Sequence, residues 1–268
     1  MVGVIGYPIT HSWSPALFNY VLDRSGIEAL YIAVSLEPSA LSRFVQHSRQ
    51  SFRGYNVTIP HKISILQHLD SLDETADFTG AVNLVVNENG TLKGYNSDVP
   101  GFLKMVEAEN VDFNHKNVGI VGSGGVSRAV LHSIQSRFNP SSIAVIARTP
   151  EKFAGFFKSL GIAVVPINDI TEKPEILINC TPIGMAHHSE NGTLPERLLI
   201  GAETFVDLVY NPQTTRSMQV VRKNGGRAIS GAKMFLYQAE ESYRRIFGLP
   251  PPHNLFQKAL NLLAVNCD

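Results

Sequence analysis

Short apolar runs alternate with amphipathic stretches along the whole chain. Val2 to Gly6 is an unbroken apolar run of the kind that forms a buried strand. Ser14 and the proline after it mark a helix start, where serine can cap free backbone N–H groups and proline fits the first turn. Leu17 and Val21, four residues apart, give this helix an apolar face before Gly26 ends it. The beginning of the chain therefore predicts a strand followed by a helix.

The alternation continues through the first hundred residues. We expect strands at Leu30 to Val34 and Tyr55 to Thr58, helices from about Ser39 and after Pro60, and two further strands at Ala81 to Val86 and Thr91 to Tyr95. Asn89-Gly90 lies between the last two strands, and this dipeptide is typical of a tight β-hairpin. The first part of the chain is therefore expected to contain a sheet that includes one antiparallel hairpin.

The alternation of strand and helix becomes regular after a polar stretch, Glu107 to Lys116, where we expect a domain boundary. Strands that alternate with helices form a parallel sheet with crossover helices. The expected strands are Val118 to Val121, Ser142 to Ala147, and segments near Ala163, Ile176, Phe205 and Arg227; the expected helices are Ser127 to Phe138, Pro150 to Leu160, Ala232 to Phe247 and Asn254 to Val265. The fold class is α/β.

The composition favours small solutes as the ligands of this chain. The 268 residues suffice for about two domains, and 23 basic residues balance 23 acidic ones, so the chain lacks the positive charge that nucleic acids or anionic membranes attract. No apolar run reaches the ~18–20 residues of a membrane span, and the first residues do not resemble a signal peptide. Only Cys180 and Cys267 occur, which favours the cytoplasm over a disulfide-forming compartment. His187 and His188 could form part of a metal site, but a solvated turn is favoured and we predict no metal.

The segment GIVGSGGVSRAV predicts a dinucleotide-binding turn. A short apolar strand enters Gly122, Gly124 and Gly125, and a helix follows. The first glycine permits the tight turn, the second lets the backbone approach a pyrophosphate, and the helix N-terminus supplies oriented N–H groups. Ser127 replaces the usual third small residue. A plain strand-to-helix connection is the alternative, and the strand and helix on either side favour the nucleotide site.

The next strand indicates which dinucleotide this is. It ends in Ala147-Arg148-Thr149, without the acidic residue that would accept hydrogen bonds from a free ribose 2′-hydroxyl. Arg148, Thr149 and Lys152 can instead hold a 2′-phosphate, which favours NADP over NAD. An exposed arginine at the start of a surface helix is the structural alternative.

Three polar clusters interrupt the apolar elements of the first half. They are Ser12 with Ser14, Asn56-Thr58-Lys62, and Asn83 with Asn96-Ser97-Asp98. Two hydroxyls at a helix start suit a carboxylate, and a lysine beside an aspartate suits proton exchange with a substrate oxygen. Each residue also has a structural explanation: a helix cap for Ser14 or Asp98, a turn for the asparagines, and a solvated helix face for Lys62. Taken singly the structural explanations are favoured, and only the joint pattern indicates a substrate site.

Taken together, these segments resemble the shikimate dehydrogenase family over nearly the whole chain. The resemblance is carried by GYPITHSWSP, NVTIPHK, GAVN, GYNSDVPGF, GSGGVSRA, ARTPEK, NCTPIGM, DLVYNP and GAKMFLYQA. It implies an oxidoreductase for the NADPH-linked reduction of 3-dehydroshikimate to shikimate, in the biosynthesis of aromatic amino acids. It also implies a substrate domain of residues 1–100 and 236–268, a Rossmann domain of residues 101–235, and an active-site cleft between them. We expect a monomer or a homodimer, with no nucleic-acid or membrane partner.

The resemblance implies a role for each matching position. Lys62 and Asp98 would form the catalytic pair. Ser12, Ser14 and Tyr210 would hold the substrate carboxylate, and Thr58, Asn83 and Gln238 would contact ring hydroxyls. The pyrophosphate would be held by Gly122, Ser123, Gly124, Gly125 and Val126, and the 2′-phosphate by Arg148, Thr149 and Lys152. The nicotinamide would be held by Leu208, Gly231 and Met234, and Glu74 is a further candidate beside the cofactor.

Some positions depart from the usual family pattern. Ala147 replaces an asparagine before the arginine, and Lys152 stands where arginine is frequent, so we expect a weaker preference for NADP. Ser97 replaces threonine, and Trp13, between the two serines, either covers the cleft or fills a surface hollow. Two alternatives remain: a quinate or shikimate dehydrogenase-like paralogue with relaxed substrate or cofactor choice, and a non-catalytic sensor, which an intact Lys62 and Asp98 argue against.

Overall fold

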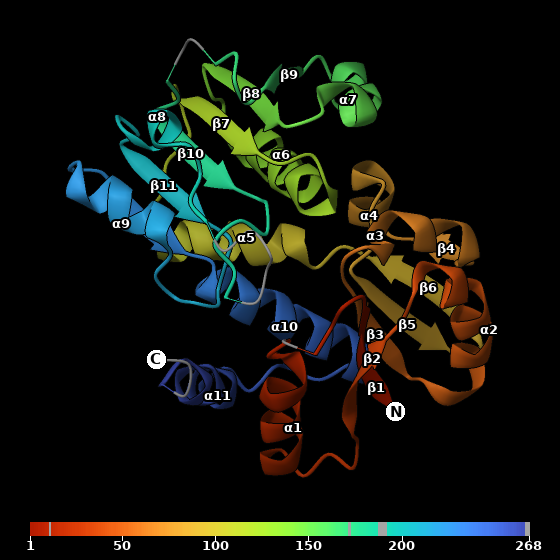
Figure 1. Ribbon diagram of the computed structural model, residues 1–268. Coiled ribbons are helices and arrows are strands. Elements are labelled where there is room, and N and C mark those ends of the chain that lie inside the picture. Colours follow the sequence, from red (N-terminus) through yellow and green to blue (C-terminus); the bar gives the residue numbers. More distant parts are fainter. Residues whose placement is uncertain (11, 171–172, 187–191, 266–268) are drawn as a thin grey trace. The chain divides into compact units, whose positions relative to one another are not determined.

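The computed structural model describes the chain except residues 11, 171–172, 187–191 and 266–268, and the side chains of residues 152–154 (Figure 1). The chain divides into two compact units. Unit 1 contains Met1–Gly101 and residues 236–265 of the described chain, and unit 2 contains Phe102–Phe235. Among the described residues, no helix has the length and apolar character needed to cross a membrane.

Unit 1 is built on a mixed six-stranded sheet in the order β2-β1-β3-β5-β6-β4. Its strands are β1 Val2–Gly6, β2 Tyr31–Ser35, β3 Gly54–Val57, β4 Ser71–Leu72, β5 Leu84–Glu88 and β6 Thr91–Tyr95. Strand β1 pairs in parallel with β2 and β3, whereas β5 pairs antiparallel with β3 and β6. The β5–β6 turn has positive φ at both Asn89 and Gly90, as a two-residue hairpin requires, so the predicted hairpin is confirmed.

Helices cover both faces of this sheet. They include α1 Ser14–Arg24, α2 Leu41–Ser51, α3 His61–Ser64, α4 Glu74–Thr79, α11 His253–Val265 and most of α10 Ala232–Phe247, with 3-10 helices at Pro38–Ala40 and Ile65–His68. Tyr55 and Val57 pack with Val45 of α2 on one side. On the other side the Phe18 ring of α1 stacks on Tyr31 and meets the edge of Phe256 of α11. Apolar residues on alternate sides of the strands thus explain why the sheet is buried on both faces.

Unit 2 has an all-parallel sheet in the order β12-β11-β10-β7-β8-β9. Its strands are β7 Asn117–Val121, β8 Ser142–Ala147, β9 Ala163–Pro166, β10 Ile176–Asn179, β11 Thr204–Asp207 and β12 Arg227–Ser230, and its helices are α6 Gly125–Arg137, α7 Pro150–Ser159, α8 Glu196–Leu199 and α9 Arg216–Lys223. Leu177 and Phe205 of the sheet pack with Leu198 of α8 and Met218 of α9. The parallel sheet with crossover helices that the second half predicts is confirmed.

Several details differ from the sequence prediction. The division between the units falls at Gly101, inside α5 Asp98–Ala108, and again inside α10 Ala232–Phe247, so the polar stretch Glu107 to Lys116 is not the boundary. Ser14 is the first residue of α1 rather than its cap: the N-cap position is Trp13, which makes no side-chain capping bond and is itself buried. The helix after Pro60 lasts only four residues before it tightens into a 3-10 turn.

Candidate active site

Lys62 and Asp98 form an ion pair within unit 1. Lys62 lies on α3, Asp98 is the first residue of α5, and the distance from Lys62 Nζ to Asp98 Oδ2 is 2.5 Å. The two side chains are 12% and 9% exposed, so neither is the solvated helix residue or the simple cap that each would be in isolation. The backbone on both sides of the pair is also held: Lys62 O accepts from Val82 N at 2.8 Å, and Asp98 N donates to Asn96 Oδ1 at 3.2 Å. An ammonium held by a carboxylate can stabilise negative charge on a substrate oxygen and exchange a proton with it.

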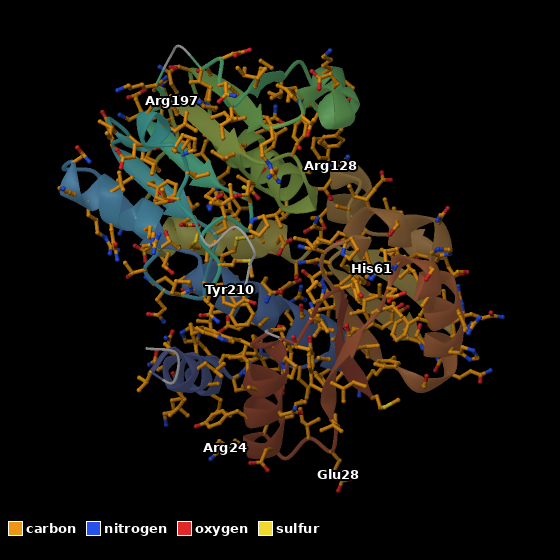
Figure 2. The ribbon with its side chains drawn as sticks, in the orientation of Figure 1. Arg24, Glu28, His61, Arg128, Arg197 and Tyr210 are labelled. Carbon is orange, nitrogen blue, oxygen red and sulfur yellow. The ribbon has the colours of Figure 1, made fainter. Side chains whose placement is uncertain are left out.

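His61, the neighbour of Lys62, anchors α3 to the core (Figure 2). Its ring is fully buried, and its Nε2 lies 2.7 Å from Leu36 O. Because a carbonyl oxygen only accepts, Nε2 carries the proton and donates it to Leu36 O. The short helix that presents Lys62 is thus tied to the segment after β2.

Ser12, Ser14 and Thr58 lie where β1 and β3 end. These two strands run in parallel with Ile5 paired to Val57, so the segments that follow them leave the same edge of the sheet. Thr58 N donates to Ile5 O at 2.9 Å, and Ser14 N donates to Ser12 Oγ at 3.3 Å. The two predicted carboxylate-binding serines are therefore neighbours joined by a hydrogen bond.

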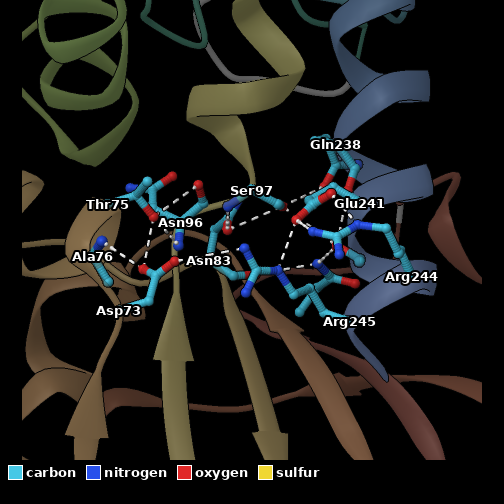
Figure 3. Close-up of polar contacts among 12 residues, drawn as sticks. Asp73, Thr75, Ala76, Asn83, Asn96, Ser97, Gln238, Glu241, Arg244 and Arg245 are labelled. Carbon is cyan, nitrogen blue, oxygen red and sulfur yellow. Dashed lines mark hydrogen bonds and ion pairs between the residues drawn. The ribbon is translucent and has the colours of Figure 1, made fainter. Parts of the chain in front are cut away.

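Asn83 and Gln238, which are 155 residues apart in the sequence, meet at Ser97 (Figure 3). Asn83 Oδ1 accepts hydrogen bonds from Ser97 N at 2.7 Å and from Ser97 Oγ at 3.1 Å. Ser97 Oγ also lies 3.5 Å from Gln238 Oε1 on α10. Unit 1 thus brings two predicted substrate-binding amides together next to Asp98.

An acidic side chain on the same helix, Glu241, was not identified from the sequence. It lies between Arg244 and Arg245, with distances of 2.5 Å and 2.7 Å from its Oε1 to the guanidinium nitrogens (Figure 3). Burial opposes its charge, but the hydrogen bonds from both arginines outweigh burial and lower the pKa of Glu241 below its usual value. All three side chains lie on α10, one turn from Gln238, and Arg245 also lies 4.0 Å from Asp73 Oδ2, which links this turn of α10 to the N-cap of α4.

The glycine-rich turn of unit 2 has the geometry of an anion-binding site. Gly122 has φ +108° and donates its N–H to Ile146 O at 2.8 Å, which makes the tight turn after β7. Gly124 is the N-cap of α6, with no side-chain capping bond, and a Cβ built on it would meet no described atom within 4 Å. The space beside Gly124 and the N-terminus of the 13-residue helix α6, which begins with Gly125 and Val126, fit a dinucleotide pyrophosphate.

Arg148 and Thr149 follow β8 directly and are exposed. Thr149 is the N-cap of α7 and makes no side-chain capping bond, so its hydroxyl is not used to start the helix. Arg148 and Thr149, at the end of β8, fit a 2′-phosphate. The side chain of Lys152 lies outside the described residues, as do His187 and His188. Among the described residues, no group of three or more His, Cys, Asp or Glu side chains could hold a metal.

The predicted nicotinamide residues lie after β11 and β12. Gly231 packs so tightly on Leu208 that a Cβ there would lie 2.3 Å from Leu208 O, which explains the glycine. Met234 is buried on the first turn of α10. Tyr210 (Figure 2) stacks on Phe235 with ring centroids 4.3 Å apart. Glu74, the remaining candidate, is the exposed first residue of α4 in unit 1.

A buried carboxylate, Asp207, supports this part of unit 2 and was not identified from the sequence. Its Oδ1 accepts from Asn179 Nδ2 at 2.9 Å and from Val209 N at 3.2 Å, and its Oδ2 accepts from Thr215 Oγ1 at 2.6 Å. Burial raises the pKa of Asp207 to about 6, although these hydrogen bonds act in the opposite direction. The network joins the ends of β10 and β11 to Thr215, the N-cap of α9, and so fixes the turn that carries Leu208 and Tyr210.

Comparison with known proteins identifies the family. A family model described as shikimate dehydrogenase substrate binding domain matches residues 4–85. Shikimate dehydrogenase (NADP(+)) of Dehalococcoides mccartyi strain CBDB1 is 34% identical over 255 residues, with 91% of this chain and 88% of the relative covered.

Two solved structures share the whole fold. Shikimate 5-dehydrogenase of Thermus thermophilus in complex with NADP(H) and shikimate has a TM-score of 0.85 at 31% identity, covering 97% of this chain and 98% of the other. Shikimate 5-dehydrogenase of Listeria monocytogenes in complex with shikimate and NAD has a TM-score of 0.82 at 27% identity, covering 97% and 95%. With fold, motifs and sequence identity in agreement over nearly its full length, the chain belongs to the shikimate dehydrogenase family.

Proposed function

We propose that this chain is an NADP-dependent shikimate dehydrogenase that catalyses the reversible reduction of 3-dehydroshikimate to shikimate. The observation that carries the proposal is the Lys62–Asp98 ion pair, in which Nζ and Oδ2 lie 2.5 Å apart. Family membership supplies the substrate class, because the relatives are named for this reaction and the Thermus thermophilus structure holds both shikimate and NADP(H).

Lys62 is the acid of the reduction. When bound, NADPH supplies the hydride that adds to the ketone carbon. Negative charge then develops on the ketone oxygen, where the Lys62 ammonium stabilises it and delivers a proton from Nζ. Asp98 keeps the ammonium in place and balances its charge. In the direction of shikimate oxidation, neutral Lys62 Nζ takes the hydroxyl proton back.

The other polar residues orient the two reactants. Ser12, Ser14 and Tyr210 bind the substrate carboxylate, and Thr58, Asn83 and Gln238 bind ring oxygens. The pyrophosphate is bound by Gly122, Ser123, Gly124, Gly125 and Val126, and the 2′-phosphate by Arg148, Thr149 and Lys152. The nicotinamide site is lined by Leu208, Gly231 and Met234. We propose these roles for residues 1–100 and 236–268 as the substrate domain and 101–235 as the nucleotide domain. We also propose that the enzyme works in the cytoplasm as a monomer or homodimer.

A second candidate is a paralogue with relaxed substrate or cofactor choice. Ala147 and Lys152 weaken the polar clamp for the 2′-phosphate, and the related Listeria monocytogenes structure holds NAD rather than NADP. A non-catalytic sensor is disfavoured, because a protein that only binds its ligand does not need an ammonium and a carboxylate paired this closely.

Steady-state oxidation of shikimate and of quinate, each with NADP and with NAD, separates these candidates. Turnover with shikimate and NADP well above the other three combinations supports the proposed function. Comparable rates with quinate or NAD support the paralogue. A folded chain that binds NADP but turns over neither substrate is a sensor.

A further inference from the structure

Ser97 is a junction of hydrogen bonds immediately before Asp98. The residue is 1% exposed, and it links the segment before β5, the start of α5 and the helix α10 (Figure 3). Its N and Oγ both donate to Asn83 Oδ1, at 2.7 Å and 3.1 Å. Its Oγ lies 3.5 Å from Gln238 Oε1 and 3.4 Å from Ser242 Oγ.

These contacts determine which end of the Asn83 amide is available to a ligand. A backbone N–H can only donate, so the Asn83 atom facing Ser97 N must be the oxygen. Both hydrogen bonds that Oδ1 accepts from the described residues come from Ser97, and the Asn83 residue is 3% exposed. Asn83 Nδ2 donates to none of the described residues, so its two hydrogens are left for an oxygen that accepts.

The single hydroxyl proton of Ser97 is also accounted for. Ser242 Oγ donates to Gln238 O at 2.9 Å and accepts from Asn56 Nδ2 at 2.9 Å, so it needs nothing further from Ser97. Of the remaining acceptors, Asn83 Oδ1 is nearer to Ser97 Oγ than Gln238 Oε1 is. The shorter contact gives the stronger bond, and the proton therefore goes to Asn83.

We propose that Ser97 is a positioning residue: it fixes the amide of Asn83 with Nδ2 toward the substrate, so that this part of the site selects a ring oxygen that accepts a hydrogen bond. The proposal rests on the proposed function, in which Asn83 binds a ring oxygen. It deepens that function by assigning the specificity at Asn83 to Ser97, whose side chain acts through its hydrogen bond to Asn83 Oδ1.

The test is a double-mutant cycle on the full-length enzyme, with shikimate and NADP. Ser97→Ala removes one of the two bonds to Oδ1, and a neutral hydrogen bond is worth about 0.5–1.5 kcal/mol, so kcat/KM for shikimate should fall about two- to twelvefold. Ser97→Thr keeps the hydroxyl and should restore the rate. In an Asn83→Ala background, Ser97→Ala should have no further effect, because the residue it positions is absent.

Two controls separate positioning from loss of stability. Ser48, equally buried on α2, donates to Val45 O at 2.8 Å and contacts none of the predicted site residues. Ser48→Ala should lower the unfolding midpoint as Ser97→Ala does, with kcat/KM unchanged. Asn83→Asp keeps an oxygen for Ser97 but loses both donors, and it should lower kcat/KM at least as far as Asn83→Ala.

Three results would overturn the proposal: Ser97→Ala with an unchanged kcat/KM, the same loss from Ser97→Ala with or without Asn83, or Asn83→Asp with the activity of the unaltered enzyme. The failure of the proposed function looks different. The unaltered chain would then show no turnover of shikimate, and Ser97 would have no role in that reaction.

Discussion

Two glycines in the turn between β7 and α6 should respond in opposite ways to an added methyl group. Gly124 has φ −84° and ψ −169°, an extended conformation that alanine adopts without strain, and a Cβ there meets no described atom within 4 Å. Because alanine also restricts the unfolded chain, Gly124→Ala should raise the free energy of unfolding by about 0.4–1 kcal/mol.

The same methyl group should block the cofactor. It would occupy the space that we assign to the NADP pyrophosphate, where the backbone must approach the phosphates closely. Overpacking a closely fitted site costs about 1–3 kcal/mol, which corresponds to a Kd for NADP raised about 5- to 150-fold. Gly124→Ala should thus give a more stable protein that binds NADP poorly.

Gly122 is the matched comparison, two residues earlier in the same turn. Its φ of +108° lies where alanine is strained, and a Cβ would lie 3.0 Å from Thr181 Cγ2 and 3.3 Å from Cys180 O. Gly122→Ala should therefore lower the free energy of unfolding by at least about 1 kcal/mol. Gly155, in the exposed middle of α7 with no described atom within 4 Å of a Cβ, is the control: Gly155→Ala should add up to about 1 kcal/mol to the free energy of unfolding and leave NADP binding unchanged.

The assay pairs denaturant unfolding with titration of NADP on the same preparations. The reasoning is refuted if Gly124→Ala binds NADP as tightly as the unaltered chain, because the pyrophosphate then does not lie beside Gly124. It is also refuted if Gly124→Ala is less stable than Gly122→Ala, because the space around Gly124 is then not open.

Three further substitutions test other parts of the account. Arg148→Ala should raise the Kd of NADP about 10- to 100-fold and leave that of NAD nearly unchanged, since only NADP has a 2′-phosphate; equal losses for both would reject this role. Asp98→Asn removes the carboxylate partner of Lys62 and should lower kcat at least tenfold with unchanged NADP affinity; a normal kcat would show that the pair is structural. Burial raises the pKa of Asp207 from its ordinary value of 3.8 to about 6 in the folded chain. As pH rises from about 4 to 7, the unaltered chain should therefore lose up to about 3 kcal/mol of unfolding free energy relative to Asp207→Asn. A difference in urea unfolding between the two proteins that does not change with pH would contradict this.

The sequence predicts well those strands and helices that are long enough for the spacing of their apolar residues to show a strand or helix period. Strand β8 and helix α10 have the predicted bounds, because one is a continuous apolar run and the other begins after a glycine and ends before one. Strand β4, with two residues, is too short to show any period, and it exists only because it pairs with β6. Helix α9 was missed although Thr215 caps it, since its eight residues are mostly polar.

The site was predictable as a set of residues but not as an arrangement. The motifs single out Lys62 and Asp98, yet their separation of 36 positions in the sequence leaves their distance in space open until β5 and β6 return the chain to α3. Asp207 was missed for the same reason, because its partners Asn179 and Thr215 lie on other turns of the chain. Glu241 has its partners three and four residues away on α10, but a charged pair at that spacing carries no sign of its burial.

The most direct test of the central claim compares the unaltered chain with Lys62→Met in shikimate oxidation with NADP, with the Kd of NADP measured alongside. Methionine keeps the length of the side chain and removes the ammonium. The account predicts that kcat falls about 10²- to 10⁴-fold while the Kd of NADP changes less than about threefold, because Lys62 acts on the reacting oxygen alone. Turnover by Lys62→Met at the rate of the unaltered chain would contradict the account.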